Sequence, residues 1–588
     1  METTITQKFG EPSASSIQLE TALRPRVEIQ LPDGRVYSGP RGATLEDFFR
    51  SIAGADKPLV VGAIVNHDLR ELTQPVLLDA QVTPVTMADA DGARIYRRSL
   101  TFLLEAAFSD LFPDAILTVD YSVTAGGYYC QVSGRAALNE QEVALLEQKM
   151  GVLVHADIPF TRENVPIDEA RAFFTEIKHF EKVRLLKYRT KPTLVLYRLG
   201  MHRDYYHGYM VPSSGYLRWF RLEPMEDGFI LRYPRRHAPE VILPLPESAL
   251  LINTFRQYGA WLNRLGIDSV GALNDSISAG RINEVILVSE ALHEQKIAEI
   301  ARKIVARAGE SRIVLIAGPS SSGKTTFSRR LSVQLLAYGL SPVPVEMDNY
   351  FVDRDLTPLD EFGHFDFEAL HTLNIERLEK DLIALIAGEE VQLPHYNFRK
   401  GLSEPGDVLK LEKDQIIILE GIHGLNPQLL PHVNPGKTFK IYASCLTQLN
   451  LDRHNRISTT DSRLIRRIVR DQRERGYSAG DTIGRWESVR RGEKKHIFPY
   501  QENSDEIFNS ALVYELAALR PLAEPVLRQV PYGAPEFIEA KRLLAFLEWF
   551  LPLDAAQVPD NSILREFLGG SILKNFKLWG ENSNADLR

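Results

Sequence analysis

Apolar and polar residues alternate near the start of the chain, which predicts short strands around tight turns. Residues 26–37 alternate on both sides of a Pro-Asp-Gly turn, a pattern typical of a hairpin. A helix is predicted from Thr44, because threonine is a common residue at the N-terminal cap of helices. Apolar runs at 60–65 and 82–87 complete a compact unit of mixed strands and one helix.

The pattern changes several times along the chain and predicts a multidomain protein of α/β and α+β classes. Helical spacing over 99–112 and strand-like runs such as 193–198 indicate a second, α+β unit, and an amphipathic helix over 291–308 leads into a third. The 588 residues exceed what one core organises. We predict a polar tail (1–24), a first domain (25–92), a second domain (93–245), a connecting segment (246–290), an α/β domain (291–510) and a helical C-terminal extension (511–588).

The third unit opens with an apolar strand, residues 312–317, followed by a Gly-x4-Gly-Lys-Thr loop and a helix from 327 to 338. In such a loop Gly318 and Gly323 let backbone N–H groups turn toward phosphates, Lys324 reaches the β and γ oxygens, and Thr325 offers a hydroxyl to Mg²⁺. The remaining expected nucleotide-binding positions are Ser320, Ser321, Ser322 and Thr326. ATP and Mg²⁺ are therefore the predicted cofactors.

Later strands of this unit deliver carboxylates at their ends. The run 342–347 precedes Asp348, and the run 414–419 precedes Glu420. In an open parallel sheet ligands bind beyond the carboxyl ends of strands, so these side chains are expected to meet the phosphate loop in one crevice. Phosphoryl transfer needs one carboxylate near the attacking hydroxyl and another organising Mg²⁺, and Asp348 and Glu420 fit these two roles.

An arginine-rich run over 463–475 is compatible with one helix. We interpret it as a lid whose guanidiniums close over the triphosphate and neutralise charge in the transition state; a plain solvated surface is the alternative.

Composition and charge narrow the classes of partner and the cellular compartment that the sequence allows. A net charge of -8 excludes a strong overall attraction to nucleic acid, so any RNA contact would be local. Two cysteines give neither metal spacing nor a disulfide framework and suit a reducing cytoplasm, where we expect the protein to reside. The polar start lacks a signal-peptide core, and no apolar run has the length of a membrane span, so no membrane partner is expected.

The third unit resembles the uridine kinase and phosphoribulokinase family over nearly its whole length. The resemblance is carried by the phosphate loop, the arginine helix and the segments 347–351, 364–366 (His364-Phe-Asp366), 394–398 and 419–421. It implies that Asp348 deprotonates a sugar 5′-hydroxyl and that Asp366, Tyr396, Tyr350 and Arg467 face the acceptor. Arg470 and Arg475 would act with Lys324 as catalytic cations that hold phosphates.

The first two units also resemble known modules. Residues 31–34, the helix from Thr44 and residues 65–66 resemble a TGS domain, the β-grasp module of threonyl-tRNA synthetases. The second unit resembles the second additional domain of threonyl- and alanyl-tRNA synthetases, in which two histidine-containing motifs supply metal or editing ligands. The corresponding positions here are Arg98, Phe102, Tyr206 and Met210, which are not zinc ligands of the usual kind, so editing is not expected. The nearby His202 and His207 are interpreted as structural or surface residues.

Two departures concern acceptor recognition. Arg399-Lys-Gly401 stands where pyrimidine nucleoside kinases carry a base-contacting histidine, and Tyr477 stands where an arginine is expected. The leading hypothesis is an ATP-dependent kinase of a uridine- or cytidine-like nucleoside. A kinase of another polyol, a nucleotide-switched RNA-binding protein acting through the N-terminal domains, and a GTPase remain alternatives, although an Asn-Lys-x-Asp motif that would read guanine is absent from the sequence. The family resemblance further implies self-association into a homo-oligomer.

Overall fold

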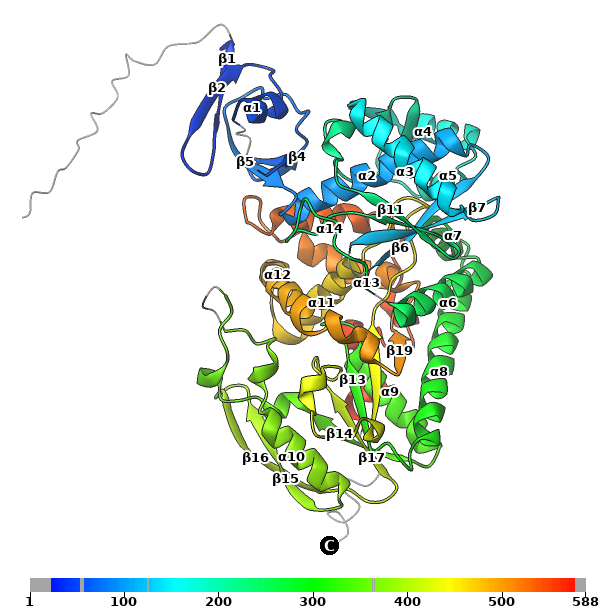
Figure 1. The fold of residues 1–588 in the computed structure, drawn as a ribbon, viewed down its shortest axis with the longest axis vertical. Coiled ribbons are helices and arrows are strands. Elements are labelled where there is room, and N and C mark those ends of the chain that lie inside the picture. The colour runs from blue at the N-terminus through cyan, green and yellow to red at the C-terminus, as the bar shows by residue number, and fades with distance from the viewer. Residues whose placement is uncertain are drawn as a thin grey trace, which may run out of the picture.

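The computed structural model describes residues 23–52, 58–123, 126–246, 248–361, 363 and 365–576 (Figure 1). Residues 1–22 of the expected polar tail lie outside this range. Within it, no helix combines the length and apolar character needed to cross a membrane.

The first domain is a five-stranded mixed sheet crossed by one helix. Its elements are β1 (Arg26–Gln30), β2 (Val36–Pro40), α1 (Leu45–Ile52), β3 (Val60–Val65), β4 (Asp68–Arg70) and β5 (Ala80–Thr86), with strand order β2-β1-β5-β3-β4. The central pair β1 and β5 is parallel, as in a β-grasp fold. Thr44 starts α1 as predicted: its hydroxyl accepts from the Asp47 N–H at 3.2 Å, and the Asp47 carboxylate accepts from the Thr44 N–H at 2.9 Å.

The second domain packs helices against two antiparallel sheets. A long helix, α2 (Ala90–Leu111), leads into the sheet β11-β12-β7-β6, and the sheet β10-β9-β8 follows. The other elements are β6 (Ile116–Val123), β7 (Gly127–Ser133), α3 (Glu140–His155), β8 (Phe160–Pro166), α4 (Ile167–Glu176), α5 (Phe180–Lys187), β9 (Thr193–Leu199), β10 (His202–Tyr205), β11 (Arg221–Met225) and β12 (Gly228–Arg232). Helix α2 begins nine residues before the predicted helix at 99–112, because its first turns carry charged residues that hide the apolar periodicity.

Three helices connect this domain to the third one. They are α6 (Ala249–Leu265), α7 (Val270–Ser278) and α8 (Ile282–Ala306), and α8 includes most of the helix predicted over 291–308. In Figure 1 α8 runs down the side of the molecule and delivers the chain to the parallel sheet.

The third domain is built on a parallel sheet of order β14-β17-β13-β18-β19. Its apolar strands are buried on both faces: α8 and α9 contribute to one core, and α10 with a hairpin contributes to the other. The elements are β13 (Ile313–Ala317), α9 (Lys324–Ala337), β14 (Ser341–Glu346), α10 (Ile375–Ile386), β15 (Glu390–Asn397), β16 (Leu402–Lys410), β17 (Gln415–Glu420), β18 (Thr438–Ser444), α11 (Thr459–Arg475), α12 (Ala479–His496) and β19 (Glu506–Asn509). The predicted multidomain fold class is thus confirmed.

The C-terminal helices are α13 (Glu515–Leu527), α14 (Phe537–Leu547) and α15 (Arg565–Leu568), and each contributes residues to one apolar core. One apolar core contains residues of α13 and α14 together with α11, α12, the connecting helices and α4 and α5 of the second domain. The second and third domains are therefore joined through a continuous core.

A buried polar cluster lies inside this joined region. The Lys182 ammonium donates to Asp204 and lies 3.9 Å from Asp452, while His454 lies 2.9 Å from Glu105. Carboxylate neighbours raise the pKa of His454 to about 10 and outweigh the desolvation that opposes protonation. Lys182 and His454 thus supply the positive charge that balances these carboxylates.

The structure places the two histidines of this region at different sites. His202 lies 3.4 Å from Glu105, and His202, Glu105 and Asp204 present ligand-type atoms within 4.8 Å of one another. His207 lies apart from this group, in the wall of a cavity described below.

We expect Lys182→Met to destabilise the protein strongly, because it leaves Asp204 and Asp452 buried without their cation. Removing one partner of a buried ion pair costs about 3–5 kcal/mol. Urea unfolding should show this loss. Lys187→Met is the matched control, since Lys187 forms its ion pair with Asp275 at the surface and should change stability by less than about 1 kcal/mol. Equal midpoints for both variants would contradict the assigned role of Lys182.

Candidate functional site

The phosphate loop joins β13 to α9, as the sequence predicts. Gly323 caps α9 with a φ of +85°, which favours glycine. At Gly318 a Cβ atom would lie 1.9 Å from the carbonyl oxygen of Ala443, so only glycine fits beside β18. The loop backbone therefore depends on both glycines.

Several loop side chains have polar atoms available for an anion. The hydroxyls of Ser321 and Ser322 are buried and have no hydrogen-bond partner among the described residues. The Lys324 ammonium donates to the Pro319 carbonyl at 3.3 Å, curled back over the loop. Orphaned buried hydroxyls beside an ammonium at a helix N-terminus fit the phosphates of a nucleotide.

Thr325 and Glu420 form the expected metal-side pair. The Thr325 hydroxyl donates to the Glu420 carboxylate at 2.9 Å. Burial raises the pKa of Glu420 to about 7, although Lys324 and the Thr325 hydroxyl favour the charged form. Both groups offer oxygen ligands of the kind that Mg²⁺ binds, so the site fits the ion.

Asp348 follows β14 at the same edge of the sheet. Its side chain is exposed, so a small acceptor can reach it. Desolvation by the surrounding protein raises its pKa, the nearby Lys324 opposes that rise, and Asp348 in turn contributes to the raised pKa of Glu420. The structure therefore brings Asp348, Glu420 and Lys324 within electrostatic reach of one another.

Among the residues expected beside the acceptor, Asp366 and Tyr396 differ from Tyr350 in their surroundings. Asp366 lies 3.6 Å from His496 of α12, and the Tyr396 ring packs edge-on against Phe351 at 5.5 Å. Tyr350 points elsewhere: its ring is buried in the core, and its hydroxyl donates to Asp381 of α10 at 3.2 Å. The side chain thus anchors α10, and its predicted contact with the acceptor stays a prediction. His364 lies outside the described residues.

The arginine helix α11 is partly a structural element. Arg463 and Arg466 are buried, and they pair with Glu493 and Glu515 respectively. These two contacts fix α11 against α12 and α13. A helix held in this way cannot move as a whole as a mobile lid. The part of the lid hypothesis that concerns residues 463 and 466 therefore needs correction.

The other arginines of α11 gather around one carboxylate. Arg467 donates to the Ser320 hydroxyl at 2.7 Å and thus reaches the phosphate loop. Arg467, Arg470 and Arg475 all lie within 3.4 Å of the buried Asp471 carboxylate. This arrangement holds three guanidiniums on the side of the helix where Arg467 meets the loop.

Three glutamates distant in sequence complete the site. Glu493 accepts from the Ser320 N–H at 3.1 Å, and Glu566 accepts from the Thr326 hydroxyl at 3.0 Å. Burial raises the pKa of Glu368 to about 7, Glu493 adds to the rise, and Arg467 and Lys324 oppose it. Sequence reasoning assigned none of the three a role at the phosphate loop, since no local spacing links them to it.

A family model described as the Phosphoribulokinase / Uridine kinase family matches residues 313–516. Among solved structures, a possible uridine kinase from Bacillus stearothermophilus aligns with 20% identity over 37% of this chain and 98% of that chain, with a TM-score of 0.25. D-glycerate 3-kinase from Cryptococcus neoformans var. grubii aligns with 16% identity over 46% of this chain and 89% of that chain, with a TM-score of 0.21.

Curated relatives match a different part of the chain. The threonine–tRNA ligase of Acidovorax sp. (strain JS42) is 31% identical over 199 residues, covering 33% of this chain and 31% of the ligase. The ligase of Bordetella pertussis (strain Tohama I / ATCC BAA-589 / NCTC 13251) is 35% identical over 204 residues, covering 33% of this chain and 31% of the ligase. The chain thus spans about a third of the length of the curated relatives it matches. The N-terminal resemblance to these synthetases is confirmed.

The phosphate loop with its carboxylates and the family match agree on the third domain. Residues 313–516, which carry the phosphate loop and its carboxylates, match the phosphoribulokinase and uridine kinase family, and the N-terminal domains are similar to those of threonyl-tRNA synthetases.

Proposed function

We propose that the protein is an ATP-dependent kinase that transfers the γ-phosphoryl group of ATP to the 5′-hydroxyl of a nucleoside of the uridine or cytidine kind. The observation that carries the proposal is the meeting of Asp348, Glu420 and Lys324 at the carboxyl edge of one parallel sheet. A switch protein would need the loop and the metal-side pair but no exposed carboxylate beside them.

The proposed reaction uses positioning and charge more than covalent chemistry by the protein. Asp348 accepts the proton of the attacking hydroxyl as the oxygen–phosphorus bond forms, and the bond between the β,γ-bridging oxygen and the γ-phosphorus breaks. Arg467, Arg470 and Arg475 offset the negative charge on the transferring group. Mg²⁺, held by Thr325 and Glu420, would neutralise phosphate oxygens when bound.

A second acceptor class has specific support. Gly401 has a φ of +72°, and a Cβ atom there would lie 2.9 Å from the side chain of Arg354, so a histidine at position 401 would be strained. The Tyr477 ring lies under the Arg485 guanidinium at 4.4 Å. Both features favour an acceptor recognised differently from a pyrimidine nucleoside, such as another polyol.

We expect Asp348→Asn to lower kcat by about 10²–10⁴-fold, because the amide cannot accept the proton of the acceptor. ATP binding should persist, since Asp348 is not part of the phosphate loop. Steady-state kinetics and calorimetric ATP titration would measure the two effects. Asp355→Asn, at an exposed position in the following loop, is the control and should leave turnover unchanged. Full turnover by the Asp348 variant would refute its role as base.

Glu368 should make the stability of the nucleotide-free protein depend on pH. Its folded pKa of about 7 exceeds the ordinary glutamate pKa of 4.5, so the folded state holds the proton more tightly and stability falls as pH rises between these values. We therefore expect Glu368→Gln to raise the free energy of unfolding in urea relative to wild type, and to do so more at pH 8 than at pH 5. Glu361→Gln, an exposed neighbour, should show no such difference. A pH-independent effect of Glu368→Gln would contradict the assignment.

The acceptor can be identified by measuring Mg²⁺-dependent ATP consumption with uridine, cytidine, adenosine, guanosine, ribose phosphates and inositols, and by weighing the product. Turnover with uridine or cytidine is expected from the family resemblance. Turnover with a polyol alone would keep the mechanism and change the substrate. Binding of ATP without turnover on any acceptor would overturn the proposed function.

A further inference from the structure

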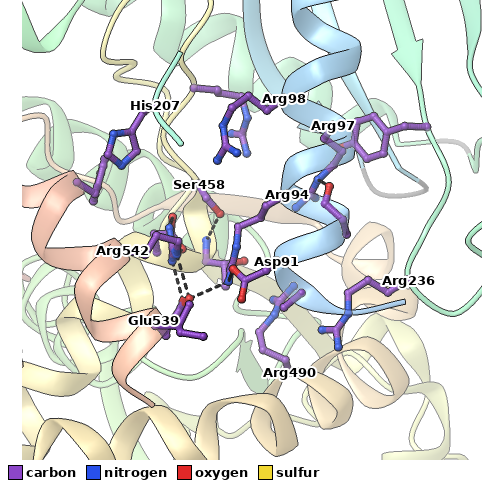
Figure 2. Close-up of a pocket in the computed structure, with 18 of the residues that line it drawn as sticks. Asp91, Arg94, Arg97, Arg98, His207, Arg236, Ser458, Arg490, Glu539 and Arg542 are labelled. Carbon is purple, nitrogen blue, oxygen red and sulfur yellow. Dashed lines mark hydrogen bonds and ion pairs between the residues drawn. The ribbon is translucent and has the colours of Figure 1, made fainter. Parts of the chain in front are cut away.

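A cavity of about 510 Å³ lies away from the phosphate loop, between the second domain and the C-terminal half of the chain (Figure 2). Its walls come from the start of α2, the segment 233–237, the segment 454–461, α12 and α14, and Ile64 of the first domain also contributes. The volume is typical of pockets that hold small molecules. All three predicted domains meet at this cavity.

The cavity is strongly basic. Eight arginines and Lys494 line it, against four carboxylates, which leaves an excess of five positive charges with the histidines neutral. The arginines are Arg94, Arg97, Arg98, Arg235, Arg236, Arg456, Arg490 and Arg542, and the carboxylates are Asp91, Asp461, Glu487 and Glu539. The protein as a whole carries a charge of -8, so this concentration is local.

Carboxylates neutralise only part of the cluster. Arg542 pairs with Asp461 and Glu539 at 2.7 Å, and Arg94 shares Glu539 at 2.8 Å. Arg97, Arg98 and Arg456 form no salt bridge within the described part of the chain. Three guanidiniums therefore line the cavity with no carboxylate of the described residues within salt-bridge distance, although Asp461 and Asp120 attract Arg97 and Arg456 from farther away.

The unpaired guanidiniums are held in place rather than floating in solvent. Arg97 lies 5.6 Å from the centre of the Tyr233 ring, and Arg456 lies 5.4 Å from that of Tyr128. Arg98 donates to the Tyr209 carbonyl at 2.7 Å. In Figure 2 Arg98 and Arg490 reach toward the cavity from opposite sides. These contacts prepare a fixed set of donors in advance of a ligand.

The electrostatic state of the cavity also favours an anion. Desolvation and the neighbouring Arg94 and Arg542 lower the pKa of Arg98 to about 10. Desolvation and basic neighbours including Arg490 lower the pKa of Lys494 to about 8. Like charges in a low-dielectric cavity repel one another, and an anionic ligand would remove that repulsion.

We propose that this cavity binds a small molecule with at least two phosphate groups, at a site separate from the kinase centre. A single phosphate would not span guanidiniums on opposite walls or balance five excess charges, whereas two or more phosphates can accept paired N–H donors from several arginines. The rings of Tyr128, Tyr233 and Trp486 add flat surfaces that suit a nucleotide base. The site goes beyond the proposed function and does not depend on it.

The proposal can be tested with the phosphate loop disabled in the full-length protein. In a Lys324→Ala background, calorimetry with inorganic pyrophosphate and with ADP should still detect binding. Adding Arg97→Gln and Arg456→Gln should weaken that binding at least tenfold. Arg302→Gln, which removes an exposed arginine of α8, is the control and should leave affinity unchanged.

Thermal melting separates lost binding from lost folding. Because Arg97 and Arg456 lack salt bridges, their replacement should not lower the melting temperature without ligand. Pyrophosphate should raise that temperature for the Lys324→Ala protein and not for the triple variant. Binding of ADP alone would assign a nucleotide, and equal binding of pyrophosphate would assign a phosphate-only anchor.

Three results would overturn the proposal. The first is the absence of pyrophosphate and ADP binding in the Lys324→Ala protein. The second is unchanged affinity in the triple variant. The third is binding of a single-stranded RNA oligonucleotide, lost in the triple variant, without binding of either small probe; this would assign the cavity to nucleic acid.

Discussion

The buried Glu493 carboxylate is the interaction on which the kinase centre depends. It is fully inaccessible, and it accepts from the Ser320 N–H of the phosphate loop, from Arg463 of α11 and from Arg490 of α12. Its negative charge is tolerated because two guanidiniums face it, and they keep its pKa below the ordinary value. One side chain thus sets the relative positions of the loop and two helices. Since Arg490 also lines the basic cavity, the carboxylate stands between the two sites.

The apolar core has a comparable effect on the domains. Because α11 to α14 share a core with α4, α5 and the connecting helices, the synthetase-like domain is packed against the kinase domain rather than tethered to it. The first domain adds polar contacts to the same region: Lys541 of α14 lies 2.7 Å from Asp68, and the Tyr532 hydroxyl donates to the Asn66 carbonyl. The basic cavity exists only because these parts meet.

The features that sequence reasoning could predict were those encoded within a few residues. The strand, glycine loop and helix around Lys324 are contiguous, and Asp348 and Glu420 could be placed together because parallel strands end at one edge. Glu493 and Glu566 could not be found this way, since they approach the loop from 173 and 240 residues away. The spacing of Arg463 and Arg466 likewise did not reveal that each faces a buried carboxylate, and Tyr350 stood in an acceptor motif although its ring belongs to the core.

The contact of the C-terminal segment with the phosphate loop bears on how the protein is made. A Cβ atom on Gly323 would lie 2.6 Å from the Ile563 side chain, and the Glu566 carboxylate accepts a hydrogen bond from the Thr326 hydroxyl. A ribosome releases the loop long before it releases these residues, and domains generally fold in the order of their synthesis. The phosphate loop of the nascent kinase sheet is therefore fully enclosed only after residues 563–566 have been synthesised. Nucleotide binding would then be acquired only after residues 563–566 are synthesised, when the synthetase-like domain has already emerged.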